Sequence, residues 1–340
     1  MDQFNVYKDM KARTNGEIYI GVVGPVRTGK STFIKRFMNL MVLPNIEDEN
    51  DRNRANDELP QSSSGKTIMT TEPKFVPNEA VSIKTEEGIE LNVRLIDCVG
   101  YMVEGATGHM EGEEERLVKT PWFDYEIPFT KAAAIGTKKV ITEHSTIGVV
   151  VTCDGSFGEI AAKQYEPAEE ETIKQLKTLK KPFVVLLNTI HPYSESTKQL
   201  AAEKEEKYQT KVLPMNLEQM KKEDIYEIIK SVLMEFPISS IGFYVPRWTE
   251  MLKKDHPLKM ELLQMARDVI TEKTTMRDIY EEQEKEYEYI TGQKLESVAM
   301  DSGEVVITVK VGDVYYYEFL SETTGMEIRN EYEFIKIMGE

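Results

Sequence analysis

The stretch GPVRTGKST at residues 24–32 carries the residue types and spacing best suited to chemistry. It matches G-x-x-x-x-G-K-[ST] between an apolar run, Ile18–Val23, and a helical pattern that begins at Lys30. In such loops backbone N–H groups surround a polyphosphate, the lysine reaches the outer phosphates and the serine contacts Mg²⁺. The motif therefore predicts a nucleoside triphosphate site with Mg²⁺. The residues expected to contact it are Gly24, Arg27, Thr28, Gly29, Lys30, Ser31 and Thr32.

A D-x-x-G motif, Asp97 to Gly100, follows the apolar strand pattern Glu90–Asp97. In phosphate-loop enzymes a carboxylate at this place holds Mg²⁺ through water, and the glycine amide contacts the γ-phosphate. We expect these roles for Asp97 and Gly100. The next residue is Tyr101, where Ras-like enzymes place a water-orienting glutamine, so we expect slow turnover.

Arg27 offers a second catalytic device. It occupies the loop position where potassium-dependent relatives place an asparagine that holds an activating cation, so its guanidinium could supply a built-in positive charge. The alternative is a solvent-facing or carboxylate-paired arginine.

Two long segments follow the motifs. The first, residues 44–77, is expected to be a polar loop, and it contains TIMTTEPKF. A threonine here can close onto Mg²⁺ and the γ-phosphate, and both Thr70 and Thr71 are candidates. The second, residues 101–127, carries an aromatic cluster that is either an ordinary surface or one exposed in a single nucleotide state.

The run FVVLLNTIHP at 183–192 predicts a buried strand that ends where translation-factor-class GTPases read guanine with N-K-x-D. Asn188 matches the asparagine, but Thr189 replaces the lysine and His191 replaces the aspartate. Guanine selectivity requires a carboxylate that accepts two hydrogen bonds, and a neutral imidazole cannot accept both. ATP is therefore the expected substrate, with Asn188 and His191 on the base side.

The elements that must position these residues follow an alternating pattern. Strand-like runs alternate with helical patterns from residue 18 to 236, which is typical of a doubly wound α/β sheet. A turn at Glu86-Glu87-Gly88 predicts one antiparallel edge strand on an otherwise parallel sheet. The strands are expected at 18–23, 80–84, 90–97, 147–152, 183–188 and 211–214, and the helices at 30–41, 128–141, 168–180, 194–209 and 217–236.

The pattern changes after residue 236, which predicts a nucleotide-binding domain, 1–236, and an α+β region, 237–340. In the second region we expect a strand at 237–245, one or two long helices over 247–290, and a β-meander from 305–311 and 314–320. No motif there indicates chemistry, which favours a structural or interaction role.

Composition restricts the class of protein. A net charge of −17 over 340 residues argues against nucleic acid as a partner, since such binders need a basic face. No apolar run approaches membrane-spanning length and no signal peptide is recognisable, so a soluble intracellular protein is expected. The two cysteines fit a reducing compartment, and the four histidines show no zinc-ligand spacing.

Taken together, GPVRTGKST, TIMTTEPKF, DCVGY, LLNTIHP and the acidic α+β extension closely resemble the stage IV sporulation protein A family, the spore-coat morphogenetic ATPases of endospore-forming bacteria. The resemblance implies an ATPase whose hydrolysis drives self-assembly into a static polymer, the basement layer of the spore coat. It assigns the phosphate-loop lysine to Lys30, the sensor threonines to Thr70 and Thr71, and the Mg²⁺-side aspartate to Asp97.

The resemblance also implies partners and a location. The polymer would lie on the mother-cell side of the outer forespore membrane, recruited by a small amphipathic peptide, with other coat proteins attaching afterwards. Members of the family extend beyond the end of this chain, so Glu340 is a candidate truncation point.

Two other functions are compatible with the residues. A regulatory GTPase that binds effector proteins would prefer GTP over ATP. A scaffold that binds nucleotide without cleaving it is disfavoured, because Lys30, Ser31 and Asp97 fill all the phosphate and metal roles.

Overall fold

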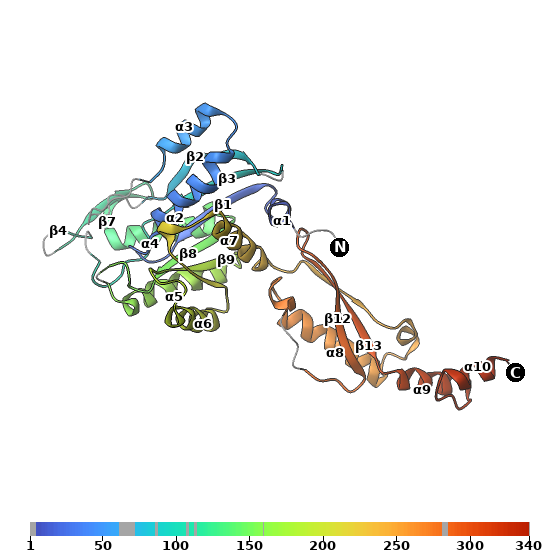
Figure 1. The fold of residues 1–340 in the computed structure, drawn as a ribbon. Helices are drawn as coiled ribbons and strands as arrows, with labels where there is room; N and C mark the ends of the chain where they lie inside the picture. Colours follow the sequence, from blue (N-terminus) through green and yellow to red (C-terminus); the bar gives the residue numbers. More distant parts are fainter. Residues whose placement is uncertain are drawn as a thin grey trace. The chain divides into compact units, whose positions relative to one another are not determined.

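The chain divides into two compact units, Met1–Phe236 and Pro237–Glu340. The structure, a computed structural model, describes residues 5–60, 72–85, 88–106, 109–111, 114–158, 160–280 and 285–339 (Figure 1). Thr70 and Thr71 lie outside the described residues.

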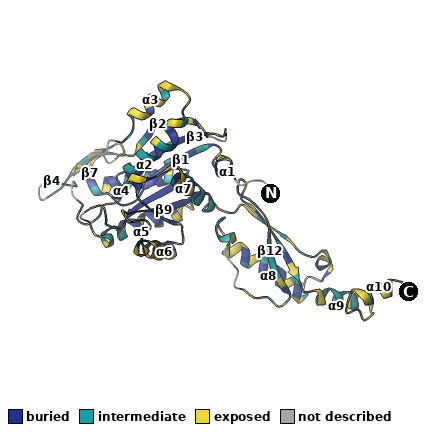
Figure 2. Ribbon diagram, viewed as in Figure 1, coloured by how far each residue is buried: buried dark blue, intermediate teal, exposed yellow. Residues whose placement is uncertain are grey.

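A sheet with the order β10-β9-β8-β1-β3-β2 forms the centre of the first unit. All neighbouring strands are parallel except β2 and β3, which confirms the prediction of a mostly parallel sheet with one antiparallel edge strand. β8 and β9 are buried along their whole lengths, as their continuous apolar sequences require (Figure 2). The strands are β1 (Glu17–Val23), β2 (Lys74–Lys84), β3 (Glu90–Asp97), β8 (Ile147–Cys153), β9 (Phe183–Asn188) and β10 (Val212–Met215).

Helices cover both faces of this sheet. Right-handed crossovers require this arrangement, because the chain steps from β1 to β3 in one direction and from β8 to β10 in the other. Side chains of α5, α6 and the turn after α4 form one core with Val150 and Val185 of the sheet, whereas α7 contacts α1. The helices are α1 (Val6–Arg13), α2 (Lys30–Phe37), α4 (Phe129–Lys139), α5 (Ala162–Thr178), α6 (Glu195–Tyr208) and α7 (Lys222–Met234).

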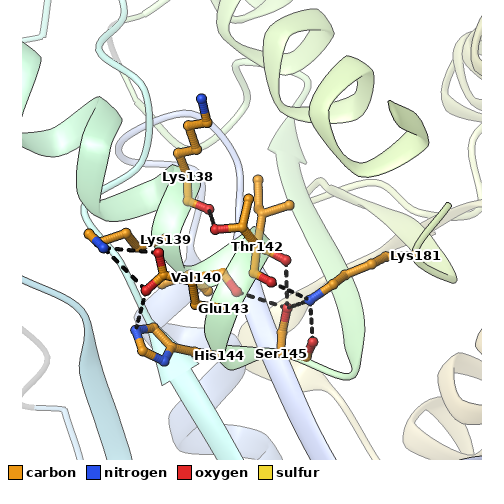
Figure 3. A network of polar contacts seen from close by, with 9 residues as sticks. Lys138, Lys139, Val140, Thr142, Glu143, His144, Ser145 and Lys181 are labelled. Carbon is orange, nitrogen blue, oxygen red and sulfur yellow. Dashed lines mark hydrogen bonds and ion pairs between the residues drawn. The ribbon is translucent and has the colours of Figure 1, made fainter. Parts of the chain in front are cut away.

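Lys181, which lies just before β9, contacts the end of the helical turn that follows α4 (Figure 3). Its ammonium donates to the backbone oxygen of Ser145 and, at 3.5 Å, to that of Thr142. These are carbonyls at a helix end that lack an intrahelical partner, and a cation there also complements the helix dipole. Burial lowers the pKa of Lys181.

Both long segments, 44–77 and 101–127, contain regular structure, although the first was expected to be a polar loop. Helix α3 (Glu49–Asp57) lies in the segment expected to be a polar loop, and Asp48 caps it by accepting from the Asp51 N–H at 2.9 Å. Only Ala55 of α3 is buried, so the helix has no apolar periodicity to detect. β2 also begins earlier than expected. In the second segment two hairpins form, from β4 (Met110–Glu111) with β5 (Glu114–Glu115) and from β6 (Leu117–Thr120) with β7 (Phe123–Pro128).

The second unit combines a sheet of order β11-β13-β12 with helices. β13 is parallel to β11 and antiparallel to β12. The strand expected at 237–245 is confirmed by β11. The elements are β11 (Ser240–Tyr244), α8 (Pro257–Glu272), β12 (Ile290–Ala299), β13 (Glu304–Val311), α9 (Asp313–Thr324) and α10 (Glu331–Gly339).

One prediction in this unit was wrong, and another was confirmed only in part. Residues 314–320, expected to be a strand, lie in α9, where Tyr316 and Phe319 contact Trp248 from one helix face. Their β propensity was overridden by this tertiary contact. Of the one or two long helices expected over 247–290, one is present as α8, and the other described residues of this range include two short 3₁₀ turns.

In the described residues, none of the helices combines the length and the apolar character needed to cross a membrane.

Candidate functional site

The predicted site residues of the first unit lie at the carboxyl edge of the sheet. The strand order reverses at β1, and ligands of open α/β sheets bind beside such a reversal. The loop 24–32 leaves β1 at this point, Asp97 ends the neighbouring β3, and Asn188 ends β9. Val22, near the end of β1, pairs with Asp97, the last residue of β3. The loop that follows β1 and the Asp97 carboxylate therefore lie at the same level along the strands.

The loop between β1 and α2 folds tightly around the Lys30 side chain. Gly24 and Gly29 adopt φ values of 126° and 101°, which residues other than glycine rarely adopt. Lys30 Nζ donates to the backbone oxygens of Pro25, at 2.5 Å, and Gly24, at 3.4 Å. Burial lowers the pKa of Lys30, while nearby Asp97 opposes the shift. A bound anion would favour the charged form of this lysine.

Ser31 and Asp97 form a pair suited to a divalent cation. Ser31 Oγ donates to Asp97 Oδ2 at 2.8 Å, and Asp97 Oδ1 is buried without a hydrogen-bond partner. Burial raises the pKa of Asp97, with Lys30 opposing. A buried oxygen without a donor carries a desolvation cost that a cation would remove. Hydroxyl and carboxylate oxygens are hard ligands of the kind Mg²⁺ uses together with substrate phosphates, so the residues fit this ion.

Asn188 joins three loops. Its amide Nδ2 donates to the Thr28 backbone oxygen at 3.0 Å, and its Oδ1 accepts from the Leu217 N–H at 3.3 Å. A Cβ at Gly29 would lie 2.7 Å from that Nδ2. Asn188 therefore positions the loop that carries Lys30, with both ends of its amide engaged.

The two substituted positions next to Asn188 have different environments. Thr189 is fully buried, so it cannot cover a base as a lysine would. His191 is exposed, and its backbone N–H donates to Thr189 Oγ1 at 3.1 Å. This loop offers no carboxylate at the position that reads guanine.

The segment after Asp97 is attached to the loop 24–32. The Val26 N–H donates to the Tyr101 backbone oxygen at 3.0 Å, and Val103 and Tyr165 join Val26 in an apolar cluster. Burial raises the pKa of Tyr101 to about 12, so the phenol stays protonated at neutral pH. The Tyr101 hydroxyl is buried without a hydrogen-bond partner.

Gly100 allows this close approach. It has a φ of 93°, and a Cβ there would lie 2.1 Å from the Gly24 oxygen and 2.7 Å from Lys30 Nζ. We expect Gly100→Ala to push the two loops apart and lower kcat/KM for nucleotide hydrolysis by at least about tenfold, since small misplacements of catalytic groups are costly. Steady-state kinetics would test this. Gly88→Ala is the control, because its Cβ would meet nothing within 4 Å although its φ is also positive. Equal losses in both variants would contradict the steric explanation.

The remaining predicted residues differ in exposure. Thr28 is buried and donates from Oγ1 to the Pro25 oxygen at 3.0 Å, Thr32 is half-buried, and Arg27 is exposed. Arg27 has a φ of 60°, a left-handed conformation uncommon for residues with a side chain.

Two structural features were not predicted from the sequence. The first is the β6–β7 hairpin, which carries the aromatic cluster of residues 101–127 and on which Lys139 of α4 contacts the Trp122 ring. A buried ion pair, Lys204 to Glu169 at 2.6 Å, joins α6 to α5, and Glu169 also accepts from Thr152 of β8. Glu169 falls on the apolar face of α5, one residue after Ala168, and this periodicity was the signal available.

A parallel-dominated sheet with its polar loops gathered at the strand-order reversal places the first unit among mixed α/β domains that bind ligands at the carboxyl edge. The chain belongs to the Stage IV sporulation protein A family, as predicted: residues 1–237 match the family's ATPase domain and residues 238–340 its middle domain.

Three relatives support this assignment. Stage IV sporulation protein A of Bacillus anthracis is 45% identical over 99% of this chain and 69% of the relative. The Clostridioides difficile protein is 47% identical over 98% of this chain and 68% of the relative. The Bacillus subtilis protein is 44% identical over 99% and 69%. The family supports a role in sporulation and an ATPase activity of the first domain.

Proposed function

We propose that the loop 24–32 binds ATP with Mg²⁺ and that the first unit hydrolyses it slowly. The observation that carries the proposal is the Ser31 to Asp97 contact of 2.8 Å beside the buried Lys30, with Asp97 Oδ1 unsatisfied. In this assignment Lys30 stabilises negative charge on the transferred phosphoryl group, and Ser31 and Asp97 hold Mg²⁺, which neutralises charge on the phosphates. The amides of the loop, including those of Gly29 and Thr32, bind the phosphate oxygens.

We assign ATP rather than GTP as the substrate. The match to an ATPase domain supports this choice, as do the buried Thr189 and the exposed His191, neither of which supplies a carboxylate at the base-reading positions. Thr70 or Thr71 would act as the sensor of the γ-phosphate. Gly100 would contribute its amide to the same group.

Hydrolysis serves assembly in this proposal. The chain would polymerise with copies of itself into the basement layer of the spore coat, on the mother-cell side of the outer forespore membrane. A small amphipathic peptide and other coat proteins would be its partners. The relatives' role in sporulation supports this part.

One experiment tests both parts of the proposal. The full chain is given ATP or GTP with Mg²⁺, and phosphate release and sedimentation are measured in the same sample. We expect ATP alone to give both phosphate and pelleted protein. A preference for GTP would instead support a regulatory switch, and pelleting without phosphate release would contradict hydrolysis-driven assembly.

Asp97→Asn should raise the Mg²⁺ concentration needed for half-maximal hydrolysis. The amide keeps the shape and can still accept from Ser31, but it loses the charge that attracts the cation. Titration of ATPase activity with Mg²⁺ measures the shift, and Asp154→Asn at the end of β8 is the control carboxylate. An unchanged Mg²⁺ midpoint in Asp97→Asn would remove Asp97 from the metal site.

Arg27→Ala should lower kcat with little change in nucleotide affinity, because a charge that acts on the transition state contributes little to ground-state binding. Fluorescent-nucleotide titration and single-turnover hydrolysis separate the two quantities. An unchanged kcat would leave Arg27 as a surface residue without a role in the reaction.

A further inference from the structure

The second unit has one sheet edge that is open to pairing. β11 pairs with β13 on one side and, in the described part of the sheet, has no strand on the other, since the bridge between Pro237 and Thr275 lies before β11 begins. An edge strand presents unpaired backbone N–H and C=O groups that another strand can bind.

The opposite edge of the same sheet is protected. β12 has two irregularities in its register with β13, between Ile290 and Gly292 and between Leu295 and Ser297. It also carries the exposed charges of Lys294 and Glu296. Bulges and charges are the devices by which proteins prevent strand addition at an edge, and β11 shows neither.

β11 and its flanking residues differ from the rest of the chain in having no charged side chains. Residues 236–246 contain no charged side chain, in a chain that is 30% charged and has a net charge of −17. Two copies of so acidic a chain repel each other at most orientations, so an uncharged edge is a place where they can approach. Ile241 and Phe243, which point toward the same face, are half-buried, and Tyr244 is 64% exposed.

Neither the backbone conformation nor the packing of the second unit requires a glycine at position 242, the centre of β11. Its φ is not positive, and an added Cβ would meet nothing closer than 3.8 Å, at Val305 and Val306. Glycine weakens a strand interior, and where it persists it often marks a close approach of another backbone.

We infer that β11 pairs antiparallel with β11 of a second copy of this chain, around a two-fold axis at Gly242. In this register Gly242 faces Gly242, Ile241 faces Phe243 and Ser240 faces Tyr244. The Ile241 to Phe243 pair joins a β-branched and an aromatic side chain, a favourable cross-strand combination. The inference supplies a contact for the self-assembly proposed above and rests on that part of the proposed function.

Cysteine cross-linking tests the register in the full chain. Directly opposed residues of antiparallel strands have Cα atoms about 4.5–5.5 Å apart, within the range of about 4.4–6.8 Å that disulfides span. We therefore expect Gly242→Cys to form covalent dimers under mild oxidation. Ser240→Cys alone should not, whereas a mixture of Ser240→Cys and Tyr244→Cys should. The native Cys98 and Cys153 are buried, so wild type gives the background.

A charge swap at the same position tests the contact without cysteine chemistry. Gly242→Glu and Gly242→Lys should each associate several-fold more weakly than wild type, because like charges would face each other, and mixing the two should restore association. Thermal unfolding of each variant checks that the fold is kept.

Phosphate release and sedimentation with ATP are measured on the same samples. ATP-dependent pelleting with Gly242→Cys cross-linking no better than Ser240→Cys would overturn the edge pairing and leave the proposed assembly intact. Cross-linking without pelleting would keep the edge pairing and contradict the polymer.

Discussion

Lys30→Ala should reduce kcat for ATP hydrolysis by about 10²–10³-fold, in line with the loss of one group that stabilises transition-state charge. Lys30 is 5% exposed and its Nζ lies among loop carbonyls, at 2.5 Å from the Pro25 oxygen. Water can hardly replace the lost charge at so buried a position. Steady-state phosphate release at saturating ATP measures the effect.

The control for this prediction is Lys163→Ala, an exposed lysine at the start of α5, which should leave kcat unchanged. Nucleotide binding by both variants is measured separately, because removal of the lysine also weakens ground-state affinity. Hydrolysis by Lys30→Ala at more than half the wild-type rate would remove the loop 24–32 from the reaction.

Lys204→Met should have the largest effect on stability, lowering the free energy of unfolding by about 3–5 kcal/mol. Lys204 Nζ lies 2.6 Å from Glu169 Oε1, and the Glu169 side chain is 0% exposed. Removal of the lysine would leave a buried carboxylate without its counter-charge. Urea denaturation of the full chain, followed by circular dichroism, measures the loss.

The same two helices provide a matched control. Lys207 and Glu170 also lie 2.6 Å apart across α6 and α5, but their side chains are 47% and 52% exposed. Lys207→Met should therefore cost no more than about 1 kcal/mol, the usual range for exposed pairs. The double variant Glu169→Gln with Lys204→Met should recover part of the loss. Equal costs for Lys204→Met and Lys207→Met would show that burial of Glu169 has no energetic consequence.

Some of the fold followed from local sequence signals. The fully buried, mostly apolar strands β8 and β9 and the loop between β1 and α2 were predicted because each is encoded by neighbouring residues. Helices α3 and α9 were not predicted from the sequence. α3 is polar on almost all sides and begins at the cap Asp48, and α9 has an aromatic sequence typical of a strand but packs against Trp248.

The candidate site shows the same division. The types and order of Lys30, Ser31 and Asp97 were sufficient to predict a phosphate and metal site, because loop and strand-end motifs place such groups at one sheet edge. The attachment of Tyr101 to Val26 and the engagement of both ends of the Asn188 amide depend on loops distant in the sequence.

The sequence by itself determined the family of this protein, the alternation of strands and helices in its first unit, and the residues expected to bind nucleotide. Only the tertiary structure decided that Glu169 and Lys204 form a buried pair, that Gly100 lies against Gly24, and that β11 is an unprotected edge. The physical reason is that periodicity and motifs report on neighbours along the chain. Burial, pairing and exposure depend on residues that only the folded sheet brings together.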